Sequence, residues 1–404
     1  MMRSAGRGRE LVRIARTGGP AAVTRRLVRR AGLALGTASL EFPLQPGDVT
    51  DAERAQAWVP AERSTPSESG ATVAWVMAPP GPGSGGHTTI FRMIAALEAA
   101  GHRCLIALYD RWGGQVSRHE RTIRDHWPQV RARVLSLSDL VAGGGATVSV
   151  ATSWPTAHAI VAREVPSRAR AYFVQDFEPW FHPKGAEQAL AEDTYRFGFT
   201  LLALGETVAT ALRGLGLEPT LVTFGCDSST YTLTNPTGPR EGVSFYARRT
   251  VARRGYELGV LALARLHELR PDVPIHTYGE ARLTLPFPQV EHGLLSPAEL
   301  ADLHNATVAG LALSFTNISL LPDEMLAAGA RPVVNDCAES RAGLPHQRVA
   351  FAPPTPTGLA AALIEQVDHP ADPTTLAASA RGEGWAPAAR IVTAQIERLA
   401  GVRT

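Results

Sequence analysis

Lysine and cysteine are scarce in this chain of 404 residues, and long apolar runs are absent. Lys184 is the only lysine, so arginine supplies nearly all of the positive charge. The three cysteines, Cys104, Cys226 and Cys337, lie far apart, which argues against a disulfide framework and a cysteine zinc site. No apolar run reaches the roughly 18 residues that span a bilayer, and the N-terminus lacks the apolar stretch of a secretory signal. We therefore expect a cytoplasmic protein.

Positive charge is concentrated at the N-terminus. Residues 1–30 contain nine arginines and one acid, Glu10, whereas the whole chain has a net charge of only +2. Because arginines alternate with apolar residues over 1–35, one interpretation is peripheral contact with the anionic inner face of the cell membrane. The other is a solvated basic tail. Nucleic acid is not an expected partner, because no interleaved aromatic residues and no known binding motif occur.

Apolar strands and helices alternate in two consecutive sets. The first begins with strand 72–78, a glycine-rich turn and helix 87–100, and the second with strand 243–247 and helix 254–269. This alternation predicts an α/β fold with two doubly wound Rossmann-like domains facing across a cleft. The expected parts are a basic segment (1–45), a first domain (46–232), a second domain (233–375) and a C-terminal segment (376–404).

Residues 314–329 predict a strand end, a polar turn and a helix. Ser319 is the expected N-cap, Gly329 the expected stop, and Glu324 a first-turn carboxylate that complements the helix dipole. Such a helix N-terminus offers unpaired N–H groups to a diphosphate, and Glu324 can accept hydrogen bonds from sugar hydroxyls. On local pattern alone, an ordinary strand–turn–helix is an equal alternative.

This segment resembles the donor-binding signature of retaining family-4 glycosyltransferases, in which seven residues separate two glutamates. Glu324 matches the second glutamate, and Thr316 stands in place of the first. The variant Ser-x-Thr-Asn-x-Ser-Leu-x-Pro-x-Glu-Met is similar to a bacterial, WsaF-like rhamnosyltransferase subgroup of surface-glycan and O-antigen biosynthesis. The resemblance spans about residues 72–390 and implies the GT-B fold, with the C-terminal helix after Trp385 returning to the first domain.

Residues 245–255 resemble the family element Gly-Arg-Leu-x-x-x-Lys-Gly, which grips the donor diphosphate. Arg248 aligns with its arginine and Arg254 with its lysine, although the spacing is one residue longer and Arg253 is an alternative equivalent. Two cations near a helix start neutralise the charge of a departing nucleoside diphosphate without a metal. A solvated arginine cluster is the alternative interpretation.

Residues 172–185 carry an apolar strand that delivers Gln175, Asp176 and Glu178 to its carboxyl end, where open α/β sheets bind ligands. The run is similar to that of the same subgroup. Its carboxylates are candidates for accepting hydrogen bonds from acceptor hydroxyls or for acid/base chemistry, with a domain-joining turn as the alternative. His158, near a helix start, is either a cleft-facing residue or a structural histidine.

The loop Gly81–Gly86 fits Gly-x-Gly-x-x-Gly between a strand and a helix, and Asp110 stands where a ribose-binding acid would. This pattern supports an NAD(P)-binding oxidoreductase as a competitor. The prolines around the loop argue against it, because proline lacks the N–H groups that a pyrophosphate uses. In the resembled family such a loop approaches donor and acceptor; a structural turn is the third interpretation.

The resemblance implies a retaining hexosyltransferase that moves L-rhamnose from dTDP-L-rhamnose to a glycan or polyprenyl-linked glycan in cell-envelope polysaccharide synthesis, with no metal or other cofactor. The alternatives are the oxidoreductase and a catalytically inactive glycan-binding GT-B protein. The candidate catalytic residues are Asp176, Glu178 and Glu324, and the candidate acceptor-binding residues are His87, His158 and Gln175. The candidate donor-binding residues are Gly85, Gly86, Arg248, Arg254, Gly293, Leu295, Thr316, Asn317, Ile318, Ser319, Leu320 and Glu324.

Overall fold

The structure is a computed structural model that describes residues 42–61, 70–318, 320–344, 347–380 and 383–402. The chain divides into two units, residues 1–49 and 50–404. Of the first unit, residues 42–49 are described, and they include the short 3-10 helix η1 (Pro46–Asp48). The arginine-rich segment 1–35 and the candidate Ser319 lie outside the described residues.

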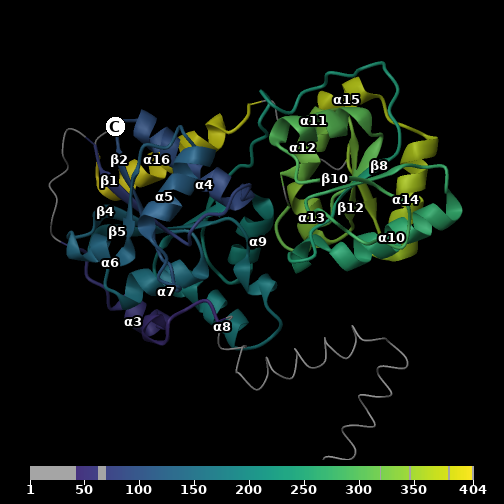
Figure 1. Cartoon of the computed structure of the whole chain (residues 1–404). Helices are drawn as coiled ribbons and strands as arrows, with labels where there is room; N and C mark the ends of the chain where they lie inside the picture. Colours follow the sequence, from purple (N-terminus) through teal and green to yellow (C-terminus); the bar gives the residue numbers. More distant parts are fainter. Residues whose placement is uncertain (1–41, 62–69, 319, 345–346, 381–382, 403–404) are drawn as a thin grey trace, which may run out of the picture. The chain divides into compact units, whose positions relative to one another are not determined.

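The second unit contains a parallel sheet of seven strands in the order β3-β2-β1-β4-β5-β6-β7 (Figure 1). The strands are β1 (Thr72–Met77), β2 (Arg103–Leu108), β3 (Arg133–Ser136), β4 (Ala146–Ala151), β5 (Ser167–Val174), β6 (Thr200–Leu204) and β7 (Thr220–Val222). The helices of this part are α3 (Ala52–Gln56), α4 (Gly85–Ala99), α5 (Val116–His126), α6 (Leu137–Ala142), α7 (Trp154–Ala162), η2 (Glu178–Phe181), α8 (Ala186–Asp193), η3 (Thr194–Arg196) and α9 (Glu206–Gly214). We call this part the first lobe.

A second parallel sheet, of six strands, has the order β10-β9-β8-β11-β12-β13. Its strands are β8 (Val243–Tyr246), β9 (Ile275–Tyr278), β10 (Val290–Gly293), β11 (Ala309–Leu311), β12 (Arg331–Asn335) and β13 (Ala350–Ala352). Its helices are η4 (Ala252–Arg254), α10 (Tyr256–Leu269), α11 (Pro297–Ala306), α12 (Leu321–Ala327), α13 (Ala338–Gly343), α14 (Pro356–Asp368) and α15 (Pro373–Ala377). This part is the second lobe.

The strand orders place a topological switch point in each sheet. In the first sheet, β1 pairs with β2 on one side and with β4 on the other. In the second, β8 likewise lies between β9 and β11. In open α/β sheets, the crevice outside the carboxyl ends of the strands at such a point is where ligands bind. The predicted fold of two doubly wound α/β halves is confirmed.

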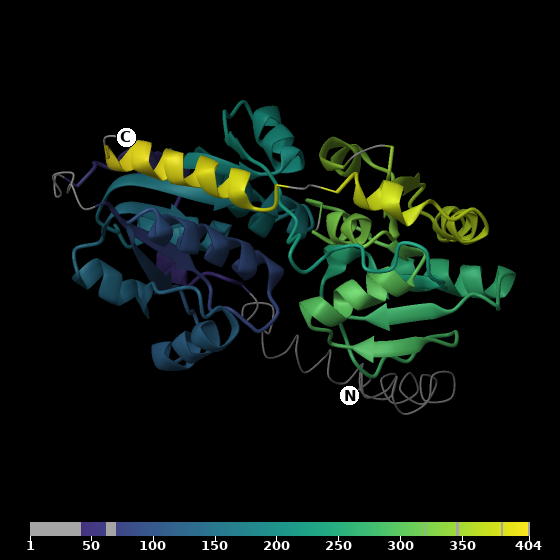
Figure 2. The same ribbon diagram turned by 90° about the horizontal axis from the view of Figure 1, so that it is seen from above.

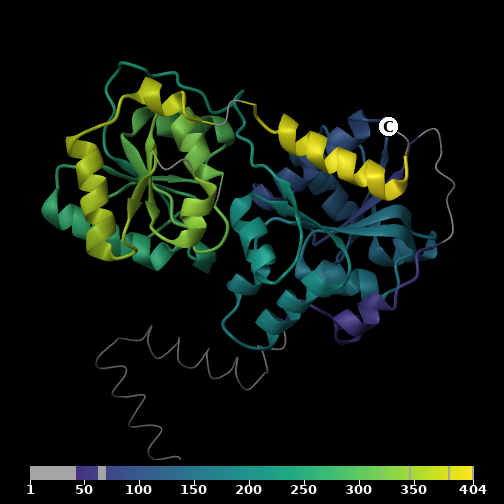
Figure 3. The ribbon, with the colours of Figure 1, turned by 180° about the vertical axis from the view of Figure 1, so that it is seen from behind.

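The last helix, α16 (Ala386–Ala400), packs against α4 and strands of the first sheet (Figures 2 and 3). Its buried face is formed by Ala388, Val392, Ile396 and Ala400, which share a core cluster with Trp75 of β1. These positions recur every four residues, which puts them on one side of a helix. Burying this stripe requires the chain to return from the second lobe to the first.

Several local predictions can be compared with the structure. Gly329, with φ of +78°, follows the end of α12 (Leu321–Ala327) as expected. The helix predicted over 319–329 is shorter, because it begins at Leu321. Among the described residues, none of the helices is long and apolar enough to cross a membrane.

Candidate functional site

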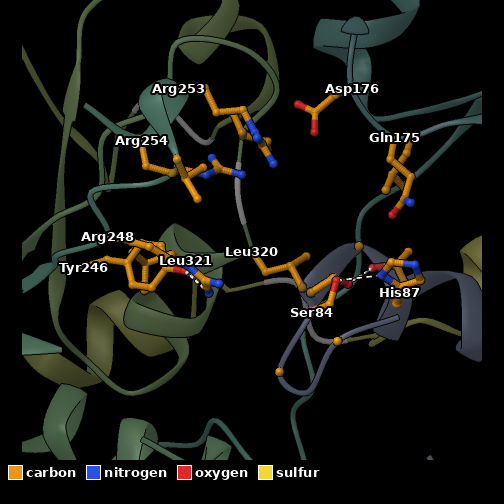
Figure 4. Close-up of a pocket in the computed structure, with 18 of the residues that line it drawn as sticks. Ser84, His87, Gln175, Asp176, Tyr246, Arg248, Arg253, Arg254, Leu320 and Leu321 are labelled. Carbon is orange, nitrogen blue, oxygen red and sulfur yellow. Dashed lines mark hydrogen bonds between the residues drawn. The ribbon is translucent and has the colours of Figure 1, made fainter. Parts of the chain in front are cut away.

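A cavity of about 740 Å³ lies at the carboxyl ends of the strands of both sheets (Figure 4). First-lobe lining comes from the loop 81–86 after β1, from Thr152 and Ser153 after β4, and from the segment after β5. Second-lobe lining comes from the ends of β8 and β9 and from residues around the start of α12. Its volume is in the range of small-molecule sites.

His87 makes hydrogen bonds to Ser84 of the glycine-rich loop and to Ala78 before it. One ring nitrogen of His87 lies 2.8 Å from Ser84 Oγ, and the other lies 3.1 Å from the carbonyl oxygen of Ala78. Burial lowers the pKa of this imidazole, which favours its neutral form. A Cβ on Gly86 would lie 3.6 Å from the side chain of Gln175, so the loop and the β5 segment approach closely. Gly85, Gly86, His87 and Gln175 all line the cavity, and their donor- and acceptor-binding roles stay predictions.

Three arginines of the second lobe, Arg248, Arg253 and Arg254, face Gln175 and Asp176 across the cavity (Figure 4). The Arg254 guanidinium donates to Ser314 Oγ at 2.8 Å, and burial lowers its pKa.

A tight turn at Gly255 directly follows Arg253 and Arg254. Gly255 ends η4 with φ of +61°, and a Cβ there would lie 2.8 Å from the ring of Phe315. The guanidinium of Arg253 lies 4.5 Å from the centre of the Phe181 ring, which belongs to the first lobe. Arg253 was weighed in the sequence only as a substitute for Arg254, yet it lines the cavity together with it.

Glu178 is the most confined carboxylate of the first-lobe wall. Its Oε2 accepts hydrogen bonds from Tyr172 Oη at 2.6 Å and from the backbone N–H of Trp154 at 2.5 Å. Burial raises the pKa of Glu178 to about 7, although these two donors and Arg253 act in the opposite direction. In the part of the chain that the structure describes, no hydrogen bond reaches Oε1. Glu178 lines the cavity, so this oxygen is available to a ligand hydroxyl.

Glu324 lines the same cavity from the second lobe. No donor within the described ranges hydrogen-bonds its carboxylate. Burial raises the pKa of Glu324 to about 8; Arg92 lowers it, while Asp323 and Asp227 raise it. Glu324 is half-buried, and a carboxylate partly withdrawn from water gains from a ligand that donates hydrogen bonds to it. This makes Glu324 a strong candidate for holding sugar hydroxyls.

Thr316 and Asn317 correct the sequence prediction. Both are 2% exposed, and neither lines the cavity, so they are not donor-contacting residues in this structure. Instead, Thr316 Oγ1 and the Asn317 N–H both donate to Asp176 Oδ1, at 2.9 and 3.1 Å. The Asn317 side-chain amide donates to the carbonyl oxygens of Gln175 and Leu204, at 2.6 and 2.9 Å. The pair therefore ties the second lobe to the ends of β5 and β6.

Asp176 is accordingly occupied by hydrogen bonds between the lobes, although it also lines the cavity. Both bonds end on Oδ1, and within the described residues no hydrogen bond reaches Oδ2. The catalytic role of Asp176 therefore stays a prediction.

His158 is a second correction. It is fully buried, and its ring nitrogens contact the Thr50 N–H and the Leu190 carbonyl oxygen, each at 3.2 Å. It does not reach the cavity, so the structural alternative holds and the acceptor-binding role is wrong. A histidine in an apolar helical run, as here in 154–162, is the local signal of such burial.

Gly293 and Leu295 are also absent from the cavity lining. Gly293 closes the end of β10, where its carbonyl oxygen accepts from the Gly279 N–H at 2.7 Å. The neighbouring lining residues are Tyr246 and Tyr278, whose ring centres are 5.6 Å apart. Sequence reasoning missed this tyrosine pair; its signal is that each tyrosine ends a buried strand of the second sheet.

Around the start of α12, Ile318, Leu320 and Leu321 line the cavity, whereas Ser319 lies outside the described residues. Within the described residues, no group of three or more histidine, cysteine or acidic side chains is arranged to hold a metal ion.

Comparison with known proteins places this geometry in context. Residues 241–364 match the family described as WsaF, C-terminal domain. The O-antigen biosynthesis protein RfbC of Myxococcus xanthus is 34% identical over 238 residues, which are 55% of this chain and 18% of that protein. The chain thus corresponds to less than a fifth of the length of this relative.

Among solved structures, Anabaena Alr3699/HepE in complex with UDP and glucose superposes with a TM-score of 0.62 at 15% identity, over 82% of this chain and all of that one. A Listeria monocytogenes protein designated a UDP-N-acetylglucosamine 2-epimerase superposes with a TM-score of 0.55 at 10% identity, over 82% and 97% of the two chains. The superpositions show a shared fold, and at such low identity they show the fold alone.

The chain therefore has the GT-B fold. Residues 241–364, in its second lobe, match the WsaF C-terminal domain. Membership of family 4 stays a prediction.

Proposed function

We propose that this protein is a retaining glycosyltransferase that moves L-rhamnose from dTDP-L-rhamnose onto a glycan or lipid-linked glycan acceptor in cell-envelope polysaccharide synthesis. The observation that carries the proposal is the two-sided cavity. One wall supplies Arg248, Arg253 and Arg254, and the other supplies the glycine-rich loop and Glu178. The similarity to an O-antigen biosynthesis protein supports the biological setting.

The arginine wall suits a nucleoside diphosphate. Guanidinium groups form strong, charge-assisted hydrogen bonds with phosphate oxygens. As the bond between the sugar C1 and the diphosphate oxygen breaks, negative charge builds on the leaving group, and fixed cations stabilise it. Arg248 and Arg253 are best placed for this, because the described hydrogen bonds of Arg254 already go to Ser314 and Asn317. The Tyr246 and Tyr278 rings would flank the nucleobase.

The two carboxylates take different parts. Glu324 would accept hydrogen bonds from hydroxyls of the donor. Oε1 of Glu178 would accept one from the attacking hydroxyl of the acceptor and so orient its oxygen toward C1. In a retaining, front-face reaction, the new C1–O bond forms on the side from which the diphosphate leaves, and the acceptor proton passes to the departing phosphate oxygen.

Rhamnose is favoured by the apolar side chains near Glu324. Ile318, Leu320 and Leu321 line the cavity, and the family glutamate that would add a second carboxylate is replaced by the buried Thr316. A 6-deoxy sugar presents a methyl group that such a surface accommodates, whereas a 6-hydroxyl would need a hydrogen-bond partner there.

Thermal unfolding with nucleotides tests the donor class. With EDTA present, dTDP at about 100 times its dissociation constant should stabilise the fold by roughly 2.7 kcal/mol. Arg248→Met should reduce that shift, whereas Arg265→Met, which removes an exposed arginine paired with Glu268 on α10, should not. Stabilisation by NAD with no response to any nucleoside diphosphate would refute the proposal.

Turnover assays then separate the possible reactions. Transfer predicts a glycosylated acceptor from dTDP-rhamnose with retained anomeric configuration, read by NMR. Because the fold is shared with a protein designated an epimerase, UDP-N-acetylglucosamine should be included. Its conversion to the 2-epimer without any transfer would assign the other chemistry.

The oxidoreductase alternative loses its ribose-binding acid. Asp110 does not line the cavity, and its carboxylate accepts from the backbone N–H groups of Trp112 and Gly114, at 2.8 and 2.7 Å. His119 lies 3.2 Å from the same carboxylate. Asp110 thus braces its own loop.

A further inference from the structure

Two of the seven tryptophans are conspicuously exposed. Trp112 is 69% exposed and Trp180 is 37% exposed. The other five are buried or partly buried: Trp58, Trp75, Trp127, Trp154 and Trp385. Exposing an indole to water forfeits a large hydrophobic gain, so a braced, exposed tryptophan marks a binding surface more often than a surface residue of another type.

Both exposed tryptophans follow strands at the same edge of the first sheet. Trp112 comes after β2 and Trp180 after β5, and all strands of this sheet are parallel. The strand order β2-β1-β4-β5 puts three strand spacings, or roughly 14 Å, between β2 and β5. The loops after the two intervening strands, including Gly81–Gly86 and Ser153, line the cavity. The tryptophans therefore bracket the first-lobe wall of the cavity.

The Trp112 loop is built to hold its position. The carboxylate of Asp110 accepts from the Trp112 N–H at 2.8 Å and from the Gly114 N–H at 2.7 Å. A Cβ on Gly114 would lie 2.4 Å from that carboxylate, so the turn closes only with glycine. The Arg111 guanidinium lies 4.3 Å from the centre of the Trp112 ring, which fixes the indole between a cation and solvent.

Trp180 is joined directly to the cavity wall. It belongs to η2, and its helical neighbours Glu178 and Phe181 line the cavity. The ring of Phe177 supports it at a centroid distance of 4.8 Å. Trp180 is therefore two residues from Glu178 in the same short helix, close to where a ligand hydroxyl would bind Glu178.

We propose that Trp112 and Trp180 are stacking platforms for sugar rings of the acceptor glycan, on either side of the ring that receives the new sugar. This rests on the proposed function and gives its acceptor a class: an oligosaccharide of several rings. One face of a pyranose presents C–H bonds, which meet the negative face of an indole, while its hydroxyls stay at the rim. Ser153, which follows β4 between β2 and β5, lines the cavity and carries a hydroxyl.

The surroundings favour a glycan over a protein or a membrane. A protein partner needs a contiguous apolar core, yet Trp112 is followed by Gly113, Gly114 and Gln115. Membrane insertion needs an amphipathic element with several apolar side chains on one face, whereas each tryptophan here stands singly in a short loop or turn.

Binding of the full-length protein to an array of bacterial surface polysaccharides tests the proposal. Trp112→Ala and Trp180→Ala should each weaken glycan binding roughly tenfold, the loss expected for one stacking contact. Trp112→Phe should retain most of the binding, because it keeps an aromatic face. Leu261→Ala, which truncates an apolar side chain 56% exposed on α10, should have no effect.

Two further measurements separate the outcomes. The dTDP-induced thermal shift of each tryptophan variant should equal that of the unaltered protein, which shows that fold and donor site are intact. Glycan binding that persists in both alanine variants would overturn the platforms while leaving the proposed function standing. So would failure of the unaltered protein to bind any arrayed glycan while it still responds to dTDP. Loss of binding to vesicles of anionic phospholipid, with glycan binding unchanged, would assign the tryptophans to a membrane instead.

Discussion

The hydroxyl of Thr316 donates a 2.9 Å hydrogen bond to a carboxylate oxygen of Asp176, so the residue that replaces a family glutamate joins the two lobes. A glutamate at this position would bring a second carboxylate against Asp176. Two negatively charged carboxylates in contact repel each other strongly when they are shielded from water. Thr316 is therefore a suitable hydrogen-bond donor for Asp176. We expect that replacing either residue alone destabilises the protein unless the other residue is replaced as well.

Removing this hydrogen bond should loosen the lobes. Thr316→Val keeps the shape but leaves Asp176 with the Asn317 N–H alone, which should lower the free energy of unfolding by about 1.5–3 kcal/mol. Thr316→Glu should lower it more and widen the particle in small-angle X-ray scattering. Thr307→Val is the control, because the hydroxyl of Thr307 bonds within the second lobe, to the Leu303 carbonyl oxygen. If Thr316→Glu is as stable and compact as the unaltered protein, this role is refuted.

Local sequence signals predict much of the fold, but they predict only some of the residues that line the cavity. Apolar strands such as 72–77 and the glycine stop at Gly329 are encoded within a few residues. By contrast, the position and hydrogen bonding of Thr316 depend on Asp176, which is 140 residues away in the sequence. Short or exposed strands such as β10 (Val290–Gly293), which is exposed or half-buried along its length, lack the apolar run that marks a buried strand.

Glu178 should give transfer a pH dependence. The pKa of Glu178 is raised to about 7 by burial, so ionised Oε1 is available to a hydroxyl only as the pH rises through that value. The transfer rate should fall on acidification below about pH 7. In Glu178→Gln the rate should be low throughout, and this acidic limb should vanish. An unchanged pH–rate profile in the variant would remove Glu178 from the mechanism.

The same residue makes a matching prediction for stability. A carboxyl group whose folded pKa exceeds its unfolded value stabilises the fold most at low pH, and this contribution is lost as the pH rises through the folded pKa. Glu178→Gln should therefore match the unaltered protein near pH 4.5 and be more stable by roughly 1–3 kcal/mol above pH 7. Denaturant titrations at the two pH values measure this difference.

Glu324→Gln should separate binding from folding. Above a pH of about 8, where Glu324 is ionised, the neutral amide accepts weaker hydrogen bonds than the carboxylate does. Each charge-assisted bond contributes about 1.5–3 kcal/mol, so turnover there should fall at least tenfold. Burial raises the pKa of Glu324 to about 8, so removing its charge should leave Tm unchanged or higher above that pH. A large drop in Tm would show that Glu324 mainly supports its helix start.

Arg92 is the cation that lowers the pKa of Glu324. Arg92→Met should therefore raise the apparent pKa of any step in the pH–rate profile that is due to Glu324, whereas Arg92→Lys should leave it unchanged.

The basic N-terminus makes a prediction that depends on charge alone, because residues 1–40 lie outside the described structure. Residues 1–30 carry nine arginines and one acid, and basic residues near an anionic bilayer contribute roughly 1 kcal/mol each. Deleting residues 1–40 should abolish sedimentation with anionic vesicles at low salt while leaving transfer to a soluble acceptor nearly unchanged. Raised salt should weaken vesicle binding of the full chain, because it screens this attraction. If the shortened protein is insoluble or loses soluble turnover, the segment belongs to the fold and the membrane interpretation fails.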